Sequence, residues 1–371
     1  MILERVQQTI EERELAGPDN PALLMVSGGS DSTALAYIAA ELRERGVLGP
    51  LAMLHVNHQL RGVDADTDAE FVRQLAEALE LPFFLVEVNV GAIAQEQGEN
   101  TEAVARSERY AAARDALESL CRHTSHPVSD GRIFTAHTQD DRVEAFYMRS
   151  IVGTGPGGFR SMRYTNGAVA RPCLDVSRQD LRDYLARRAL DVEAGDAKPL
   201  ARDASGALWR EDATNAHTDR FRSYVRHEIV PKAVERNPQL LDVLSRSMNL
   251  IADEDDMLDA WTRKLIVEQV KWDNTEDQAA GCVLAPAFGA LELPLQRRMV
   301  FELLKGMLGP EARIETASIE AVLEGYADGV PISGYTNNIQ GNLALSANKH
   351  GLRIEPMDTY RARRKPEKGD V

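Results

Sequence analysis

Cysteine is scarce in this chain, and the positions of its cysteines exclude several kinds of site. Cys121, Cys173 and Cys282 are the three cysteines among 371 residues, and no two of them form a C-x-x-C pair. Their wide spacing argues against a disulfide framework, a zinc knuckle and an iron–sulfur centre. We interpret all three as buried thiols without a chemical role.

Long hydrophobic runs are also absent. A membrane-spanning helix needs roughly 20 consecutive apolar residues, and the runs in this sequence are far shorter. The first residues, MILERVQQTIEERELAG, are charged and helix-patterned, unlike a secretory signal. We therefore predict a cytoplasmic protein without a membrane partner. The sequence does not determine the oligomeric state, and a homodimer is one of the open alternatives.

Positive charge is in deficit, with a formal net charge of −15 at pH 7. Proteins that bind nucleic acid are usually basic. The total charge therefore counts against a nucleic-acid partner unless the basic residues are clustered. Candidate clusters lie in 210–227, at 297–298 and in the tail from 361 to 368.

Short β-like runs alternate with longer helical patterns through the first 150 residues. The expected strands are 23–26, 51–56, 83–88 and 133–136, and the expected helices are about 32–45, 66–80, 101–122 and 140–150. This alternation predicts an α/β fold, with a parallel sheet covered by helices on both faces. In such sheets ligands bind beyond the carboxyl ends of the strands.

The remainder of the chain is organised differently. Residues 153–167 are rich in glycine and read as a loop, and the pattern from 236 to 330 is helical. A short β-rich segment with a basic tail follows. We predict a catalytic domain over 1–235, a helical domain over 236–330 and a small β-rich part over 331–371.

The first expected strand is followed by the sequence SGGSDS, which has the features of a phosphate-binding loop. Two adjacent glycines allow a ligand to approach the backbone, and the start of the next helix offers free amides to an anion. A simple helix cap after a glycine turn is the alternative reading. The predicted ATP-binding residues of this loop are Ser27, Gly28, Gly29, Ser30, Asp31 and Ser32.

A carboxylate in an anion-binding loop needs an explanation. Asp31 would repel a triphosphate, unless a divalent cation such as Mg²⁺ lies between them. Such a loop would hold the two terminal phosphates as a leaving group. The expected reaction is therefore attack at the α-phosphate, which yields AMP and diphosphate.

The second and third strands also end in candidate ligands. HVNHQLRG (55–62) places His58 at the edge of the sheet where ligands are expected to bind. His58 either binds the nucleotide or the substrate, or has no functional role. NTEAVARSERY (100–110) brings Arg106 and Arg109 onto one helix face, where they could bind a phosphate or a carboxylate. A surface ion pair between Glu102 and Arg106 is the alternative.

The fourth strand leads into the acidic segment TAHTQDDRVEAF (135–146). His137, Asp141 and Glu144 share one helix face, and Asp140 is adjacent. Acidic residues at a helix start also stabilise the helix dipole, which is the alternative explanation. Because this segment begins at the same sheet edge as Asp31, its carboxylates would suit a metal ion or an incoming ammonium group.

These motifs occur in an order that resembles the tRNA(Ile)-lysidine synthetases of the ATP-pyrophosphatase (PP-loop) superfamily. A further match is REDATNAHTDRFRSYVRHEIVP (210–231), and the resemblance covers about residues 20 to 235. The chain departs from the family pattern at five positions. These are Thr138, Ala145, Val152, Ser161 and Ser223.

The resemblance implies a Rossmann-like PP-loop fold and a specific ligase reaction. The wobble cytidine of tRNA(Ile) with a CAU anticodon would be adenylated by ATP at its C2 oxygen. Free L-lysine would then displace AMP and give lysidine. The residues implied as catalytic are Asp31, Arg106 and Asp141, those for lysine are Arg109, His137, Asp140, Asp141 and Glu144, and those for tRNA are Arg220, Arg222 and Arg226.

Three other functions remain open from the residues. A tRNA thiolase of the same superfamily typically needs a cysteine pair, which this chain lacks. An ATP-dependent amide-forming synthetase for a small molecule would suit the acidic total charge. A non-catalytic RNA-binding relative is the third, although the retained Asp31 and Asp141 argue against it.

Overall fold

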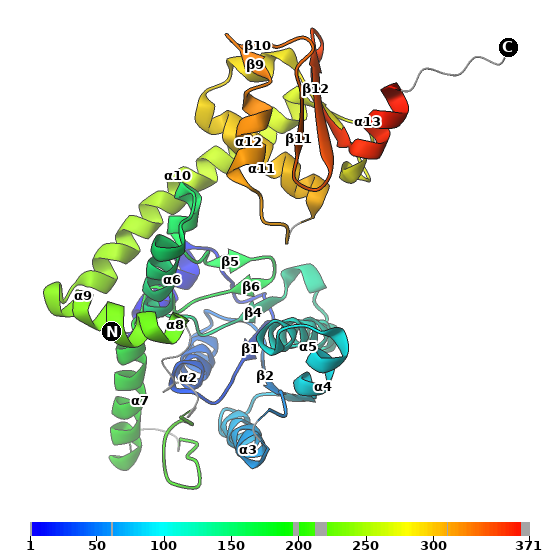
Figure 1. Ribbon diagram of the computed structural model, residues 1–371. Coiled ribbons are helices and arrows are strands. Elements are labelled where there is room, and N and C mark those ends of the chain that lie inside the picture. Colours follow the sequence, from blue (N-terminus) through cyan, green and yellow to red (C-terminus); the bar gives the residue numbers. More distant parts are fainter. Residues whose placement is uncertain (1, 61, 196–199, 212–220, 310, 365–371) are drawn as a thin grey trace. The chain divides into compact units, whose positions relative to one another are not determined.

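The computed structural model describes residues 2–60, 62–195, 200–211, 221–309 and 311–364. Arg220, expected to bind tRNA, lies outside the described residues. The chain forms two compact units, Met1–Ala252 and Asp253–Val371 (Figure 1). This division falls within a long helix, whereas the sequence suggested boundaries at 235 and 330.

A six-stranded sheet forms the centre of the first unit. Its strands are β1 (Ala22–Met25), β2 (Leu51–Asn57), β3 (Phe83–Glu87), β4 (Arg132–Phe134), β5 (Thr165–Asn166) and β6 (Val169–Ala170), in the order β3-β2-β1-β4-β6-β5. The pairs β2–β3, β1–β2, β1–β4 and β4–β6 are parallel, and β5 pairs antiparallel with β6. The four expected strands are thus present and parallel.

Helices cover both faces of this sheet because successive strand residues point to opposite sides. Leu24 packs into a core with α1 (Ile2–Glu12), α2 (Ser30–Glu44), α3 (Val63–Ala78) and α7 (Arg178–Glu193). Its neighbour Leu23 packs into a second core with α5 (Thr101–His123) on the other face (Figure 1). The predicted α/β class with helices on both faces is confirmed.

The strand order reverses at β1. The chain moves outward from β1 to β2 and β3, and then returns through α4 (Val90–Gln97) and α5 to place β4 on the other side of β1. Adjacent loops at such a switch point diverge and leave a crevice at the carboxyl ends of the strands. The loops after β1 and β4 therefore flank the expected ligand site.

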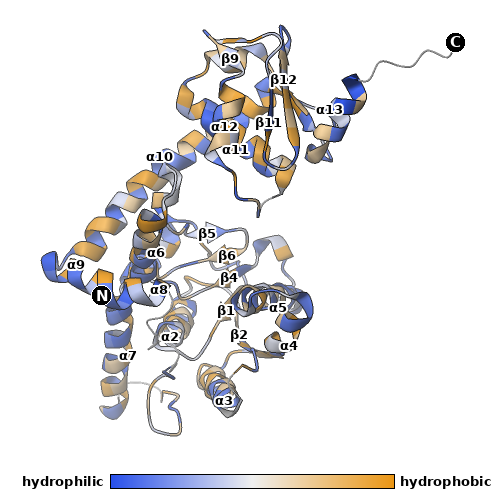
Figure 2. Ribbon diagram, in the orientation of Figure 1, coloured by the Kyte–Doolittle hydropathy of each residue, from blue (hydrophilic) through white to orange (hydrophobic). Residues whose placement is uncertain are grey.

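The rest of the first unit is mainly helical, and its last helix continues into the second unit. The elements are α6 (Gln139–Val152), the 3₁₀ turns Val128–Asp130 and Pro156–Arg160, α8 (Phe221–Tyr224), the π-helix Val225–Ile229, α9 (Val230–Arg236) and α10 (Leu240–Gln269). Hydrophobic and hydrophilic residues alternate along α10 (Figure 2). Among the described helices, none is long and apolar enough to cross a membrane.

The second unit contains a sheet that the sequence did not predict in full. Its elements are β7 (Val270–Trp272), β8 (Cys282–Leu284), α11 (Leu293–Leu308), α12 (Thr316–Leu323), β9 (Tyr326–Ala327), β10 (Val330–Pro331), β11 (Thr336–Ile339), β12 (Leu343–Asn348), β13 (Gly351–Pro356) and α13 (Met357–Arg364), with 3₁₀ turns at Gln278–Ala280 and Pro286–Ala290. The five-stranded order is β11-β12-β13-β8-β7. Two strands of this sheet, β7 and β8, thus come from the region read as helical, and so does β9, which pairs with β10.

Candidate functional site

An open cavity of about 1070 Å³ lies at the carboxyl ends of β1, β2 and β4. Pockets for small ligands usually measure about 300–1,000 Å³, so this one has room for a nucleotide and part of a second substrate. Its lining brings together residues from all four motifs. Among them are Ser27, Asp31, His58, Arg106, His137 and Asp141.

The loop from Ser27 to Ser32 is fixed by hydrogen bonds between its own hydroxyl groups and backbone. Ser32 Oγ donates to the carbonyl of Gly29 at 3.1 Å and accepts from the amide of Ser27 at 3.2 Å. Gly28 has a φ of +93°, in the region that favours glycine. As α2 begins at Ser30, the amides of its first turn precede the helical hydrogen-bond ladder and are available to an anion.

A distant segment fixes the back of this loop. The amide of Arg210 donates to the carbonyl of Gly28 at 2.8 Å. The guanidinium of Arg210 donates to Asp68 and to Asp203, each at 2.9 Å. The sequence had grouped Arg210 with basic residues for RNA phosphates, but these two carboxylates already neutralise it.

Asp31 faces a guanidinium from α7. Arg178 Nε donates to Asp31 Oδ2 at 3.0 Å, and Ser30 Oγ donates to Asp31 Oδ1 at 3.0 Å. Burial raises the pKa of Asp31, and Arg178 opposes that shift. Asp31 is thus a partly buried carboxylate at the mouth of the loop.

Asp141 is the most heavily bonded carboxylate of the site. Its Oδ2 accepts from the amide and the hydroxyl of Thr138, at 2.8 and 3.1 Å. Its Oδ1 accepts from Arg222 at 2.8 Å and lies 3.4 Å from Arg178. Burial would raise the pKa of Asp141, but the two guanidiniums and Thr138 outweigh it and lower the pKa. Thr138, a departure from the family pattern, thus caps the helix that carries Asp141.

Glu144 lies one turn further along α6 and is 2% exposed. Arg226 donates to both of its oxygens, at 2.6 and 3.0 Å, and Arg222 Nε donates to Oε2 at 2.9 Å. Arg226 lies in the π-helix, a distortion that is frequent at functional sites. The two arginines expected on a tRNA-binding surface therefore contact the acidic cluster, and Arg226 lines the cavity.

Arg178 connects the loop to the acidic helix. Besides Asp31 and Asp141, its side chain lies 3.6 Å from Glu144, and its amide donates to Asp140 Oδ2 at 2.8 Å. Burial alone would lower the pKa of Arg178, but the surrounding carboxylates raise it. Burial also raises the pKa of Asp140.

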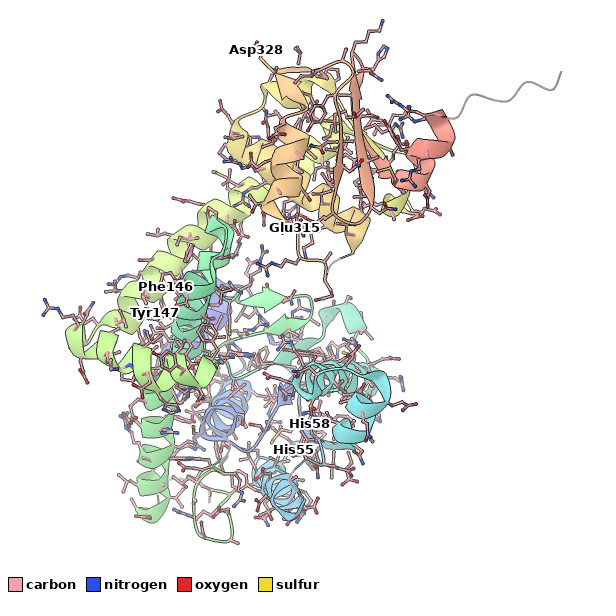
Figure 3. All side chains as sticks on the ribbon, viewed as in Figure 1. His55, His58, Phe146, Tyr147, Glu315 and Asp328 are labelled. Carbon is pink, nitrogen blue, oxygen red and sulfur yellow. The ribbon has the colours of Figure 1, made fainter. Side chains whose placement is uncertain are left out.

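Histidines and arginines of the other two motifs form the opposite part of the lining. Figure 3 labels His55 and His58 at the end of β2. His55 Nδ1 donates to the carbonyl of Val26 at 2.8 Å, and His58 lines the cavity. Arg109 donates to His58 Nε2 at 3.3 Å. Burial, together with Arg109, lowers the pKa of His58 to about 4.

His137 and Arg106 complete the residues that the sequence singled out. His137 Nδ1 lies 2.9 Å from Thr135 Oγ1, and burial lowers the pKa of His137 to about 4. Arg106 is exposed and lies over the ring of Tyr110 at 5.0 Å. Both histidines are therefore neutral near pH 7.

Sequence reasoning missed three residues of this site. Arg178, Arg182 and Trp209 all line the cavity, yet they lie far along the chain from the loop. Arg178 and Arg182 are four residues apart on α7 and so share one helix face. This spacing, in a helix that starts after Ser177, was the sequence pattern that could have identified them. The sequence alone does not show that α7 packs against α2, which brings both arginines to the loop.

The acidic residues suit a divalent ion only together with phosphate oxygens. Within the described ranges no group of three or more His, Cys, Asp or Glu side chains could hold a metal. Mg²⁺ commonly binds through one or two carboxylates plus substrate phosphates. Asp31 at the loop fits that donor set.

Proteins of known name are similar to this chain over most of its length. Over 354 residues the chain is 32% identical to the tRNA(Ile)-lysidine synthase of Thermus thermophilus, in a match that covers 95% of this chain and 61% of that protein. The enzymes of the same name from Dehalococcoides mccartyi and Caldanaerobacter subterraneus are 32% and 29% identical, over 84% and 81% of this chain and 63% and 59% of theirs.

This chain therefore spans about three fifths of the length of these relatives. The PP-loop domain family matches residues 2–197, which include the Ser27–Ser32 loop, the acidic segment of α6 and Arg178. That range is more than half of the 371 residues. The chain belongs to the PP-loop domain family.

Proposed function

We propose that this chain ligates free L-lysine to C2 of the wobble cytidine of a CAU-anticodon tRNA(Ile), using ATP and releasing AMP and diphosphate. The observation that carries the proposal is a single cavity with an anion-binding loop and an acidic cluster that share Arg178. The relatives named above carry the same activity in their names. An anion and a cation could therefore bind side by side.

The loop would bind the nucleotide through its terminal phosphates. The first amides of α2 offer hydrogen bonds to these oxygens, and the helix dipole favours negative charge there. Asp31 would hold Mg²⁺ against the phosphates, and the ion would neutralise charge on the leaving group. The hydroxyls of Ser27 and Ser32 lie 3.2 Å apart and link the two ends of the loop.

The acidic cluster would receive the lysine ammonium. Free lysine has a pKa of about 10.4, so nearly all of it arrives protonated. Asp141 has a pKa held below its usual range and is therefore a weak base but a good counter-ion. We accordingly assign Asp141 and Glu144 to binding and orienting the ammonium. Adenylation of the C2 oxygen would turn it into a good leaving group for attack by the amine.

The RNA would present its base to this cavity from outside. A cytidine must leave the anticodon stack to bring its C2 oxygen to the α-phosphate. Arg106 and Arg109 line the cavity and pair with no carboxylate among the described residues. They would contact the phosphate backbone or the bound nucleotide.

One assay tests the proposal directly. The chain is incubated with ATP, radiolabelled lysine and transcribed tRNA(Ile), and label in the RNA is measured with and without ATP. We expect ATP-dependent label, with one AMP formed per lysine incorporated. AMP formation without labelled RNA would instead favour another PP-loop ligase that acts on a small molecule.

Replacing Asp141 tests whether this carboxylate binds the ammonium group of lysine. Asp141→Asn should raise the KM for lysine at least about tenfold, since it removes a charge that binds the ammonium. Asp183→Asn alters an exposed carboxylate on α7 and serves as the control. Lysidine formation by Asp141→Asn at the wild-type rate and KM would remove Asp141 from this role.

A further inference from the structure

The anion-binding loop contains no cationic side chain of its own, but α7 brings one to it. Arg182 Nε donates to Ser30 Oγ at 3.4 Å, at the first residue of α2. Arg182 lies one helical turn after Arg178 and lines the same cavity. The loop therefore has a guanidinium beside the hydroxyl of Ser30.

Arg182 differs from the other arginines around the loop in its charge balance. Arg178, Arg210 and Arg226 each pair with carboxylates, as described above. Arg182 pairs with no carboxylate among the residues that the structure describes. Its positive charge is thus still available to an anionic ligand, whereas the charges of the other three are already neutralised.

Trp209 holds this guanidinium in place without neutralising it. Arg182 lies over the indole ring, 5.8 Å from the ring centroid. Trp209 precedes Arg210, whose amide is bonded to the loop at Gly28. Arg182 and Trp209 thus form a wall on one side of the loop, and stacking on an aromatic ring limits the freedom of the arginine side chain.

We propose that Arg182 is the cation that binds the terminal phosphates of the nucleotide and the released diphosphate. The inference deepens the proposed function and rests on its ATP-dependent step alone. In that step a bond forms between the acceptor oxygen and the α-phosphorus, and the bond from that phosphorus to the bridging oxygen breaks. The electron pair stays on the departing diphosphate, and Arg182 stabilises the charge that develops there.

Binding of inorganic diphosphate with Mg²⁺ tests this role apart from catalysis. Isothermal titration of the full chain should show at least about tenfold weaker binding for Arg182→Gln than for wild type, because a charge-assisted contact is lost. Arg182→Lys, which keeps the charge, should recover part of the affinity. The KM for ATP should rise in parallel, with the KM for lysine unchanged.

Arg187→Gln is the matched control, because Arg187 is an exposed arginine on the same helix. It should bind diphosphate like wild type. If Arg182→Gln fails to fold, Arg182→Met keeps the apolar stem over Trp209 and answers the same question. Diphosphate affinity within twofold of wild type in the charge-free variant overturns the inference.

The two proposals can fail separately. A wild-type chain that binds diphosphate through Arg182 but transfers no lysine to RNA would refute the lysidine proposal and leave the role of Arg182 intact. If the wild-type chain makes lysidine and Arg182→Gln retains both its KM for ATP and its diphosphate affinity, the lysidine proposal stands and the role of Arg182 is refuted.

Discussion

Gly28 determines the backbone path of the loop after β1. Its φ of +93° is rarely adopted by residues with a side chain, although an added Cβ would meet its nearest neighbours at an ordinary 3.5 Å. Gly28→Ala should therefore destabilise the first unit through conformation alone, by about 1–2 kcal/mol, and raise the KM for ATP. Thermal unfolding and ATP kinetics measure both effects.

Gly29→Ala provides the comparison at the adjacent position. Gly29 has a φ of −70°, which alanine adopts freely, and the nearest atom to an added Cβ is 3.7 Å away. Its melting temperature should stay close to that of wild type. If both variants lost the same amount of melting temperature, steric space around the added methyl group, rather than backbone conformation, would explain why these positions are glycine.

His58 should make the stability of the protein depend on pH. Its pKa is about 4 in the folded state, below the ordinary histidine value of 6.5. Between these two values the unfolded chain binds more protons, so this histidine lowers stability as pH falls from about 6.5 to about 4. His137, whose pKa is also lowered to about 4, acts in the same direction. His58→Gln should therefore remove part of this slope, measured as melting temperature against pH.

His123→Gln is the control for this measurement, because His123 is exposed at the end of α5. It should leave the slope between these two pH values as it is in wild type. A slope in His58→Gln equal to that of wild type would assign the acid sensitivity to other groups, His137 among them.

At the residue scale, the sequence identified side chains close to their own motif. Asp31 and Asp141 were predicted because each follows a strand of a parallel sheet, and such strand ends share one edge. Arg178 was not predicted, because its partner Asp31 lies 147 residues away. Only the packing of α7 on α2 brings the two together.

At the scale of elements, α6 is held by a buried arginine on the face away from Glu144. Arg142 is 1% exposed and donates to Asn249 on α10 at 2.8 Å and to the hydroxyl of Tyr164 at 3.2 Å. It also pairs with Asp175. Helix α6, which carries the acidic cluster, is thereby tied to the start of α10.

Removing this arginine should cost far more than removing a surface one. Arg142→Met leaves Asp175 without its guanidinium and should lower stability by about 3 kcal/mol, measured by thermal unfolding. Arg122→Ala removes an exposed pair with Glu118 and should cost at most about 1 kcal/mol. Similar losses in both variants would contradict a structural role for Arg142.

Short strands explain where the element prediction failed. β7 and β8 have three residues each, Val270–Trp272 and Cys282–Leu284, too few for an alternating pattern to stand out. They become strands by pairing with each other and with β13. In the first unit the longer periodic segments were predicted, and the structure confirms them.

At the scale of the whole molecule, the net charge of −15 does not show which arginines are paired with carboxylates. Several of those expected to bind RNA phosphates are neutralised by carboxylates. Arg297 pairs with Glu320, Arg298 with Asp255 and Asp259, and Arg363 with Glu355. Phosphate binding would therefore depend on few unpaired cations.

Salt should nevertheless weaken binding of tRNA. Each phosphate contact releases counter-ions, so the logarithm of affinity falls linearly with the logarithm of salt concentration. Between about 50 and 200 mM salt we expect at least about a tenfold loss, measured by filter binding, with lysine affinity as the reference. A flat response would exclude phosphate contacts.

The acidic cluster has a further consequence for what can enter it. Asp31, Asp141 and Glu144 pair with three guanidiniums, those of Arg178, Arg222 and Arg226. Asp140 accepts from the amide of Arg178 beside them. With every group ionised, negative charge exceeds positive charge by one. When Arg182 is engaged by an anionic ligand, a guest bearing one positive charge balances the remaining groups, whereas a doubly charged ion exceeds that balance unless a further anion enters with it.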